Sequence, residues 1–187
     1  SFKDVSAGGG HTCGVNSSGS VECWGNDYDF QSTPPSGSFV SVNAGFAYTC
    51  GVNSSGNVAC WGWDFYGQST PPSGTLEGVS AGGSHTCGVN SSGSLECWGW
   101  DVYGQSTPPS GSFESVSAGD EHTCGVKPDG SLECWGYDNH GQSTPPSGSF
   151  ESVSAGGSHA CGVNSSGSLE CWGKDNYGQV TDAPTGP

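Results

Sequence analysis

The chain has 187 residues, of which 31% are hydrophobic and 34 are glycine. The formal net charge of −15 disfavours nucleic acid and anionic membranes as partners, because phosphate neutralisation needs clustered Lys and Arg and only three basic residues are present. No apolar run reaches the roughly 18 residues of a membrane span, so membrane insertion is not expected. Low apolar content with high charge is typical of disorder, but ten cysteines and recurring aromatic residues indicate a folded chain.

The sequence is built from five tandem units of 37 residues. A Phe or Leu opens each unit, and a Trp-Gly pair recurs at the same interval. Because the units fill the chain, we expect a single domain over residues 1–187. The units span residues 2–38, 39–75, 76–112, 113–149 and 150–186.

In chain order, the third unit predicts strands over 76–82, 85–89 and 94–99 and a short fourth strand over 104–107. Gly and Pro recur every few residues, which excludes helices of useful length. The first strand is rich in Ser, Ala and Gly, as expected for the crowded axis of a β-propeller. The fourth ends at a Pro-Pro pair, as expected for an outer edge.

Four-stranded units of this length are typical of propeller blades. An open solenoid would need atypical end units, whereas the first and last units here are nearly ordinary. The sequence therefore predicts an all-β, five-bladed β-propeller closed into a ring. The strand over residues 2–8 is expected to complete the ring against the last unit, and the protein is expected to be a monomer.

Each unit contains two cysteines ten positions apart, on either side of a turn such as Asn16–Gly19. Facing residues of antiparallel strands lie within disulfide reach, so we predict five disulfides within the blades. Zinc is the competing interpretation, with a His and a Glu beside the cysteines as further ligands. The second unit has Tyr48 and Ala59 in their places yet keeps both cysteines, which favours disulfides, no metal and an oxidising compartment. The pairs are Cys13/Cys23, Cys50/Cys60, Cys87/Cys97, Cys124/Cys134 and Cys161/Cys171.

The motif A-G-G-x-H-T-C-G-V, followed by G-x-L-x-C-W-G-x-D-x-Y-G-Q, resembles the repeat of the regulator of chromosome condensation family. It is closest to the short, Cys-containing bacterial type and covers all five units. The resemblance implies a β-propeller. Family members include a nucleotide exchange factor for a small GTPase, a secreted β-lactamase inhibitor and surface proteins, and no position here carries over the contacts of the first two.

Two kinds of recurring polar residue have a structural interpretation and a functional one. A His opens the second strand in four units, and an Asp follows every Trp-Gly pair. Four copies of His favour a hydrogen bond to a turn carbonyl over catalysis. The Asp favours a turn in which its carboxylate accepts from nearby N–H groups over calcium binding. The residues are His11, His85, His122 and His159, and Asp27, Asp64, Asp101, Asp138 and Asp175.

The units differ mainly in the loop after the first strand and the loop after the third. In an antiparallel blade these loops share one end, and loops on a rigid scaffold commonly bind ligands. The competing interpretation is drift at exposed positions. The candidate ligand-binding residues are Trp63, Tyr66, Trp100, Tyr103 and Tyr137, with the carboxylates Asp120 and Glu121.

No catalytic constellation or cofactor site stands out, so no enzyme activity is expected. The predicted function is a secreted or cell-surface binding module, lectin-like or protein-binding, for a carbohydrate or protein ligand. The alternatives are a structural or adhesive repeat domain of a larger surface protein and a secreted enzyme inhibitor.

Overall fold

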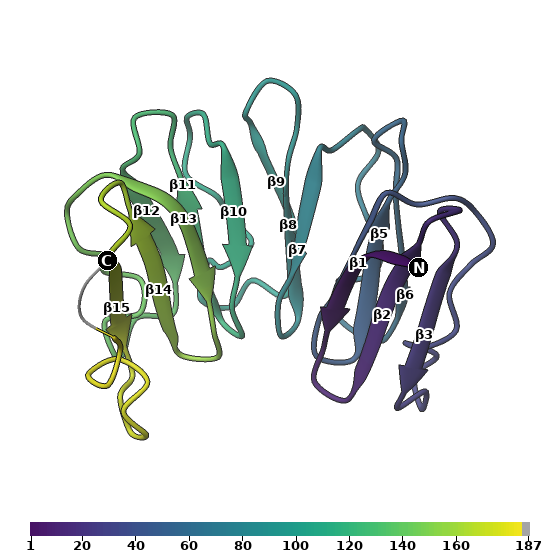
Figure 1. The fold of residues 1–187 in the computed structure, drawn as a ribbon, viewed down its shortest axis with the longest axis horizontal. Helices are drawn as coiled ribbons and strands as arrows, with labels where there is room; N and C mark the ends of the chain where they lie inside the picture. Colours follow the sequence, from purple (N-terminus) through teal and green to yellow (C-terminus); the bar gives the residue numbers. More distant parts are fainter. Residues whose placement is uncertain (185–187) are drawn as a thin grey trace.

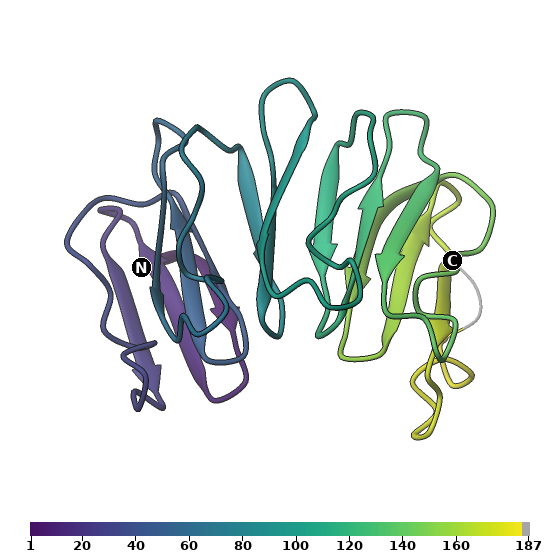
Figure 2. The ribbon, with the colours of Figure 1, turned by 180° about the vertical axis from the view of Figure 1, so that it is seen from behind.

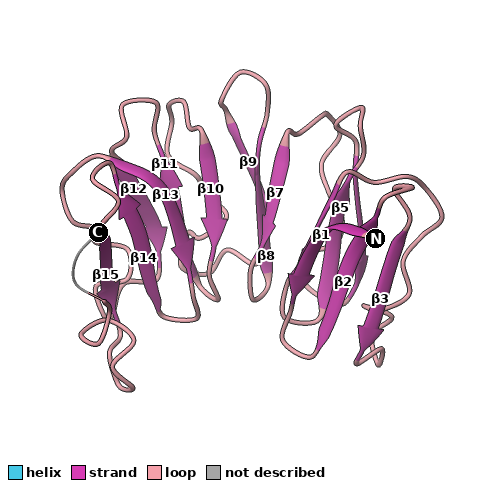
Figure 3. Ribbon diagram, viewed as in Figure 1, coloured by secondary structure: helices cyan, strands magenta, loops and turns pink. Residues whose placement is uncertain are grey.

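A computed structural model describes residues 1–184 as fifteen strands in five three-stranded sheets (Figures 1 and 3). Each sheet is one blade and corresponds to one sequence unit, so the predicted all-β architecture of five blades is confirmed. Within these residues no helix is long and apolar enough to cross a membrane. The strands are β1 (Phe2–Ala7), β2 (His11–Asn16) and β3 (Val21–Gly25) in blade one; β4 (Ser41–Ala44), β5 (Tyr48–Val52) and β6 (Val58–Gly62) in blade two; β7 (Gly78–Ala81), β8 (His85–Val89) and β9 (Leu95–Gly99) in blade three; β10 (Ser115–Ala118), β11 (His122–Val126) and β12 (Leu132–Gly136) in blade four; and β13 (Phe150–Ala155), β14 (His159–Asn164) and β15 (Leu169–Gly173) in blade five.

Each blade is an antiparallel meander in which the middle strand pairs with both neighbours. The two cysteines of a blade lie directly opposite each other in this pairing, and all five blades share the register. Every cysteine is disulfide-bonded within its own blade, with the two Cα atoms 4.0–4.1 Å apart. The predicted disulfides are confirmed, and they take up the sulfur atoms that a zinc site would need. The bonds are Cys13–Cys23, Cys50–Cys60, Cys87–Cys97, Cys124–Cys134 and Cys161–Cys171.

The predicted fourth strand is wrong. Residues 104–107 form turns, in which Gly104 has a φ of +80°. The carboxylate of Asp101 accepts hydrogen bonds from Ser106 N at 2.7 Å and from Thr107 Oγ1 at 2.6 Å. These two bonds fold the segment back on itself, so it is not extended enough to add to the sheet.

In blades one to four, the two cysteines of a disulfide differ in burial, which their spacing in the sequence does not predict. Cys50 and Cys124, on middle strands, are fully buried. Cys60 and Cys134, their partners on third strands, are only partly buried. In blade five, Cys161 and Cys171 are both partly buried. In blades one to four the contrast arises because the third strand is the outer edge of the sheet, with no fourth strand beside it in residues 1–184. These third-strand sulfur atoms therefore border the core instead of lying inside it.

Consecutive blades are joined by an apolar core and a shared carbonyl. Leu76 and Trp98 of blade three pack against Tyr48 and Cys50 of blade two. The carbonyl of Gln68, from the second unit, accepts from Trp98 Nε1 at 2.9 Å and from Thr86 Oγ1 at 3.1 Å. The Trp, Thr and Gln of the repeat therefore hold one blade to the next, which explains why they recur in nearly every unit.

The closed ring expected from the sequence is not completed in residues 1–184 by contact between the first and last blades. Each blade packs on the next, but no comparable interface joins β1 to blade five. In Figures 1 and 2 the termini lie at opposite sides of the row of blades. Phe2 and Trp24 of blade one are 52% and 51% exposed, whereas the equivalent Phe39 and Trp61 of blade two are 7% and 9% exposed.

Candidate functional site

The two variable loops of each blade lie at the same end, as predicted. Trp100 N, just after β9, donates to the carbonyl of Ser84 in the loop between β7 and β8 at 2.9 Å. In blade four, Tyr137 N donates in the same way to the carbonyl of Glu121. The near-constant turns between the second and third strands occupy the other end of the blades.

The loop after the third strand is held rigidly in shape. In the second unit, Asp64 accepts from Ser69 N and Thr70 Oγ1 at 2.7 and 2.6 Å. The side chain of Gln68 is fully buried, and its Oε1 accepts from Tyr66 N at 2.9 Å. The recurring Asp and Gln residues therefore fix the backbone from which the variable aromatic side chains project.

Six aromatic side chains from blades two, three and four form one continuous cluster, which we call the aromatic row. Tyr66 links two blades, since its ring centroid lies 5.5 Å from that of Trp63 and 5.8 Å from that of Trp100. Tyr103 likewise lies 5.5 Å from Trp100 and 4.6 Å from Tyr137 of blade four. The row consists of Trp63, Phe65, Tyr66, Trp100, Tyr103 and Tyr137.

The aromatic row is partly packed and partly open to solvent. Phe65 is 76% exposed, and Tyr66 and Tyr103 are 42% and 43% exposed. Tyr177 occupies the equivalent position in the fifth unit and is 90% exposed. The difference arises because Tyr66 and Tyr103 each rest on an aromatic side chain of the next blade. The row thus combines a fixed geometry with accessible rings.

The two predicted carboxylates flank one end of the row. Asp120 is exposed and Glu121 is partly exposed, in the loop whose backbone is hydrogen-bonded to Tyr137. Asp120 also borders a cleft of about 230 Å³ at the axis, where glycines and alanines from all five blades meet Phe46. The structure brings five predicted aromatic residues together and sets the two acidic residues beside them.

The disulfides support this surface without taking part in it. Each third-strand cysteine lies three positions before the variable residue that follows the strand, as Cys60 does before Trp63 and Cys134 before Tyr137. Cys171 stands in the same relation to Lys174 of the fifth unit. Because these sulfur atoms are all bonded to middle-strand cysteines, they offer no thiol to a ligand or a metal. The ten predicted cysteines are therefore structural residues.

Phe65 and Phe46 are two exposed aromatic residues near the site that sequence reasoning left out of it. Both stand at positions that vary between units, so this variability was the signal available. Phe65 contacts Trp63 and Tyr66 directly. Phe46 is 64% exposed beside the axial cleft. A sequence pattern places both in variable loops without showing which of their neighbours they touch.

His11 and His85 each bond to a threonine of the next blade and not to the turn carbonyl that we expected. His85 is fully buried, and its Nε2 lies 2.7 Å from Thr123 Oγ1 of the next blade. Burial lowers the pKa of His85 to about 4. In blade two, Tyr48 takes the place of the His and donates to the carbonyl of His85 at 2.6 Å. Both side chains bridge neighbouring blades, which a pattern within one unit could not show.

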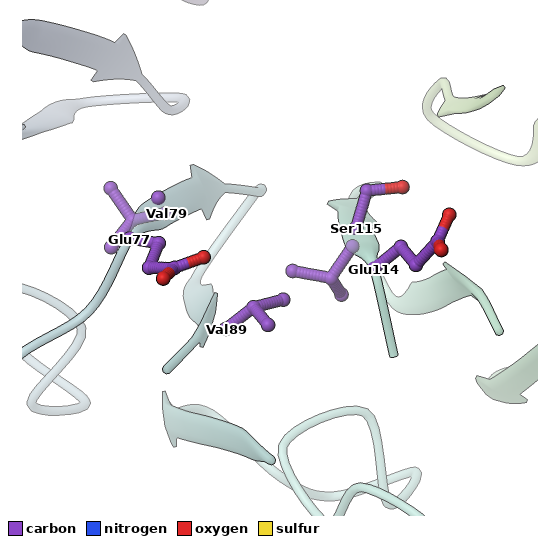
Figure 4. Close-up of a pocket in the computed structure, with 7 residues that line it drawn as sticks. Glu77, Val79, Val89, Glu114 and Ser115 are labelled. Carbon is purple, nitrogen blue, oxygen red and sulfur yellow. The ribbon is translucent and has the colours of Figure 1, made fainter. Parts of the chain in front are cut away.

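The opposite end of the blades carries a second cleft, which lies between blades three and four and is shown in Figure 4. Its volume is about 240 Å³, and Val79 and Val89 contribute apolar walls. Glu77 and Glu114 flank it, so it does not favour anionic ligands. It contains none of the predicted ligand-binding residues.

The repeats of the chain match one protein family throughout. The model of the regulator of chromosome condensation (RCC1) repeat matches residues 2–31, 39–68, 77–105, 113–142 and 150–179. The chain belongs to this family. The resemblance noted in the sequence is thereby confirmed, and so are the propeller blades that it implied. Comparison with curated proteins gives no match.

Solved propeller structures are similar over nearly the whole chain. The CRINKLY WD40 ectodomain of the Arabidopsis thaliana receptor kinase ACR4 is 30% identical, with a TM-score of 0.78 over 97% of this chain and 66% of that one. The ectodomain of the Physcomitrella patens receptor kinase CR4 is also 30% identical, with a TM-score of 0.77 over 90% of this chain and 49% of that one. Prp20p from Saccharomyces cerevisiae is 17% identical, with a TM-score of 0.81 over 94% of this chain and 58% of that one. The chain therefore spans 49% to 66% of the length of these structures.

Proposed function

We propose that this protein is an extracellular binding module that holds a protein partner on the aromatic row. The observation that carries the proposal is the continuity of the row across three blades. Aromatic side chains supply large, rigid contact area at low conformational cost, and they are enriched where proteins bind one another. The Asp and Gln hydrogen bonds in the supporting loops keep this surface preorganised.

Two further observations support an extracellular location. Five disulfides are typical of proteins in an oxidising compartment. Two similar structures at 30% identity are ectodomains of receptor kinases. The module itself is proposed to have no enzymatic activity, because its recurring Asp carboxylates and the imidazoles of His11 and His85 are committed to structural hydrogen bonds. Its charge of −15 disfavours nucleic acid and favours a partner with basic residues.

A carbohydrate ligand is the second candidate. The ring of Phe65 is 76% exposed and stands beside Tyr66, so it could stack against the apolar face of a sugar. The two candidates differ in the hydrogen-bonding groups that the surface must provide, since a sugar has many hydroxyl groups and each needs a hydrogen-bond partner.

A random peptide display library and a glycan array, both probed with the purified protein, test the proposal. We expect enriched peptides whose binding is lost in the double variant Tyr66→Ala/Tyr103→Ala. The matched control is Tyr28→Ala/Tyr177→Ala, which removes two tyrosines that are 89% and 90% exposed and lie outside the row. Thermal unfolding of each variant checks that its fold is retained.

Two outcomes would overturn the proposal. In one, peptides bind both double variants equally well, so the row is not the binding surface. In the other, only glycans bind, and they do so through the row; the carbohydrate candidate then replaces the protein partner.

A further inference from the structure

We propose that the partner segment held by the aromatic row is proline-rich and adopts the extended polyproline II conformation. The inference rests on the proposed function and specifies the chemistry of the partner. It follows from which hydrogen-bonding atoms the row offers, which it withholds, and how its rings are spaced.

The row offers free donors. Within residues 1–184, neither the indole N–H groups of Trp63 and Trp100 nor the hydroxyl groups of Tyr66 and Tyr103 bond to another protein group. By contrast, Trp98, in the core, donates to a backbone carbonyl. Four aromatic donors on a solvent-facing surface match a ligand that is rich in carbonyl acceptors.

The carboxylates beneath the row are already engaged. Both carboxylate oxygens of Asp64 accept bonds from the loop that follows, and those of Asp101 and Asp138 do the same. A sugar needs acceptors for its hydroxyl groups, and an ordinary peptide strand needs acceptors for its N–H groups. Proline has no N–H, so a proline-rich segment suits a surface that offers donors and few acceptors.

The spacing of the rings fits the same ligand. Successive centroids from Trp63 to Tyr137 lie 4.6–5.8 Å apart. A polyproline II segment advances about 3.1 Å per residue and repeats every three residues. Neighbouring rings are thus about 1.5 to 2 residues apart along such a ligand. Because the rings contact one another, its prolines would lie across their exposed faces and not between them.

Charge sets the direction of the segment. Asp120 and Glu121 lie at the blade-four end of the row, and their carboxylates accept no hydrogen bond from residues 1–184. A Lys or Arg beside the prolines would pair with them there. The preferred partner is a proline-rich segment with a basic residue at one end.

An array of short peptides tests this inference. It carries proline-rich sequences with a terminal Lys or Arg and, as controls, the same sequences with each proline replaced by alanine. We expect binding to the proline-rich peptides and at least about tenfold weaker binding to the alanine controls. Tyr66→Phe and Tyr103→Phe remove one donor each but keep the ring, so each should weaken binding by about threefold to tenfold. Tyr28→Phe and Tyr177→Phe should leave it unchanged.

The outcomes separate this inference from the function on which it rests. If the random library yields proline-free peptides that depend on Tyr66 and Tyr103, the protein-binding function stands and the inference falls. Equal binding of alanine controls, or no effect of the Tyr→Phe variants, also overturns it. If no peptide of either collection binds, both the inference and the proposed function fail.

Discussion

The interior blades and the two edge blades have nearly the same sequence but different surroundings. Blade three buries Leu76 and Trp98 on one side and Val89 on the other, all less than 10% exposed. Blade one exposes half of Phe2 and Trp24, and blade five leaves Leu169 41% exposed. At every interior interface, one face of a blade packs against the opposite face of its neighbour. Blade one leaves the first kind of face uncovered, and blade five leaves the second. The comparison shows that contact with a neighbour, more than the blade's own sequence, decides which residues are core.

Repeat proteins gain much of their stability from interfaces between neighbouring units. Each blade here has only three short strands and a disulfide, so it buries little apolar surface alone. Identical substitutions at equivalent positions should therefore have different effects in edge and interior blades.

The largest contrast is expected between Trp98→Ala and Trp24→Ala. Trp98 is 9% exposed and bonds to Gln68, so its loss should cost about 3–5 kcal/mol of unfolding free energy. Trp24 is 51% exposed and its ring contacts the exposed ring of Phe2, so its loss should cost less than about 1 kcal/mol. Urea unfolding measures both values. Trp172→Ala in blade five should resemble Trp98→Ala, because Trp172 is 8% exposed against blade four; equal costs for Trp24 and Trp98 would contradict the comparison.

The second contrast concerns pH and the buried histidines. Burial disfavours the imidazolium form and lowers the pKa of His85 and His122 to about 4 from the ordinary 6.5. Between these values the unfolded chain binds more protons, so stability is complete above pH 6.5 and falls as the pH drops toward 4. Each histidine accounts for up to about 3 kcal/mol of this loss.

The measurement is urea unfolding at pH 7.5 and pH 4.5. The variant His85→Gln should lose up to about 3 kcal/mol less stability between these two pH values than the unsubstituted protein. His140→Gln is the control, because His140 is exposed on a loop of the fourth unit. An unchanged loss in His85→Gln would show that this imidazole is not the group that senses pH.

The third contrast lies within one interface. Thr123 Oγ1 bonds to His85 Nε2 at 2.7 Å and to the carbonyl of Gln105 at 3.1 Å. The equivalent residue in blade five is Ala160, and within residues 1–184 the buried Nε2 of His122 has no hydrogen-bond partner. Ala160→Thr should restore the bond and stabilise the protein by about 1 kcal/mol. Ala160→Val has the same shape without the hydroxyl, so an equal gain for it would show that packing, not hydrogen bonding, is responsible.

Much of the fold could be predicted from the sequence because five copies of one unit show which positions stay constant and which vary. The ten-residue spacing of cysteines such as Cys13 and Cys23 predicts a disulfide between facing strands. The second unit argues against metal binding, because it keeps both cysteines without the neighbouring His and Glu. The prediction of a fourth strand is wrong because Ser106 and Thr107, which would belong to that strand, hydrogen-bond to the carboxylate of Asp101 instead. Contacts between blades, such as that of Tyr66 with Trp100, depend on how units stack and lie beyond the pattern within one unit. The aromatic row was therefore predictable as a set of variable positions but not as a continuous surface.

The smallest contrast concerns a turn position at which the first unit departs from the others. Gly67, Gly104, Gly141 and Gly178 occupy it with φ of +77° to +80°, whereas Phe30 has φ of +64°. A left-handed conformation costs a residue with a Cβ roughly 1–2 kcal/mol, and Gly avoids this cost. Phe30 is 69% exposed, so little packing offsets the strain. Phe30→Gly should therefore stabilise the protein by up to about 1 kcal/mol, after the greater entropy loss of Gly on folding is subtracted.

The reciprocal change gives the same test in an interior unit. A Cβ added at Gly104 meets no atom within 4 Å, so Gly104→Ala should destabilise by about 1 kcal/mol through backbone strain alone. Urea unfolding of both variants at pH 7.5, above the histidine transition, keeps the two effects apart. If Phe30→Gly raises the free energy of unfolding and Gly104→Ala lowers it, both effects arise from the positive φ at this turn position. If Phe30→Gly instead lowers the free energy of unfolding, the Phe30 ring makes stabilising contacts despite its exposure. Blade one would then be better packed than its exposed side chains indicate.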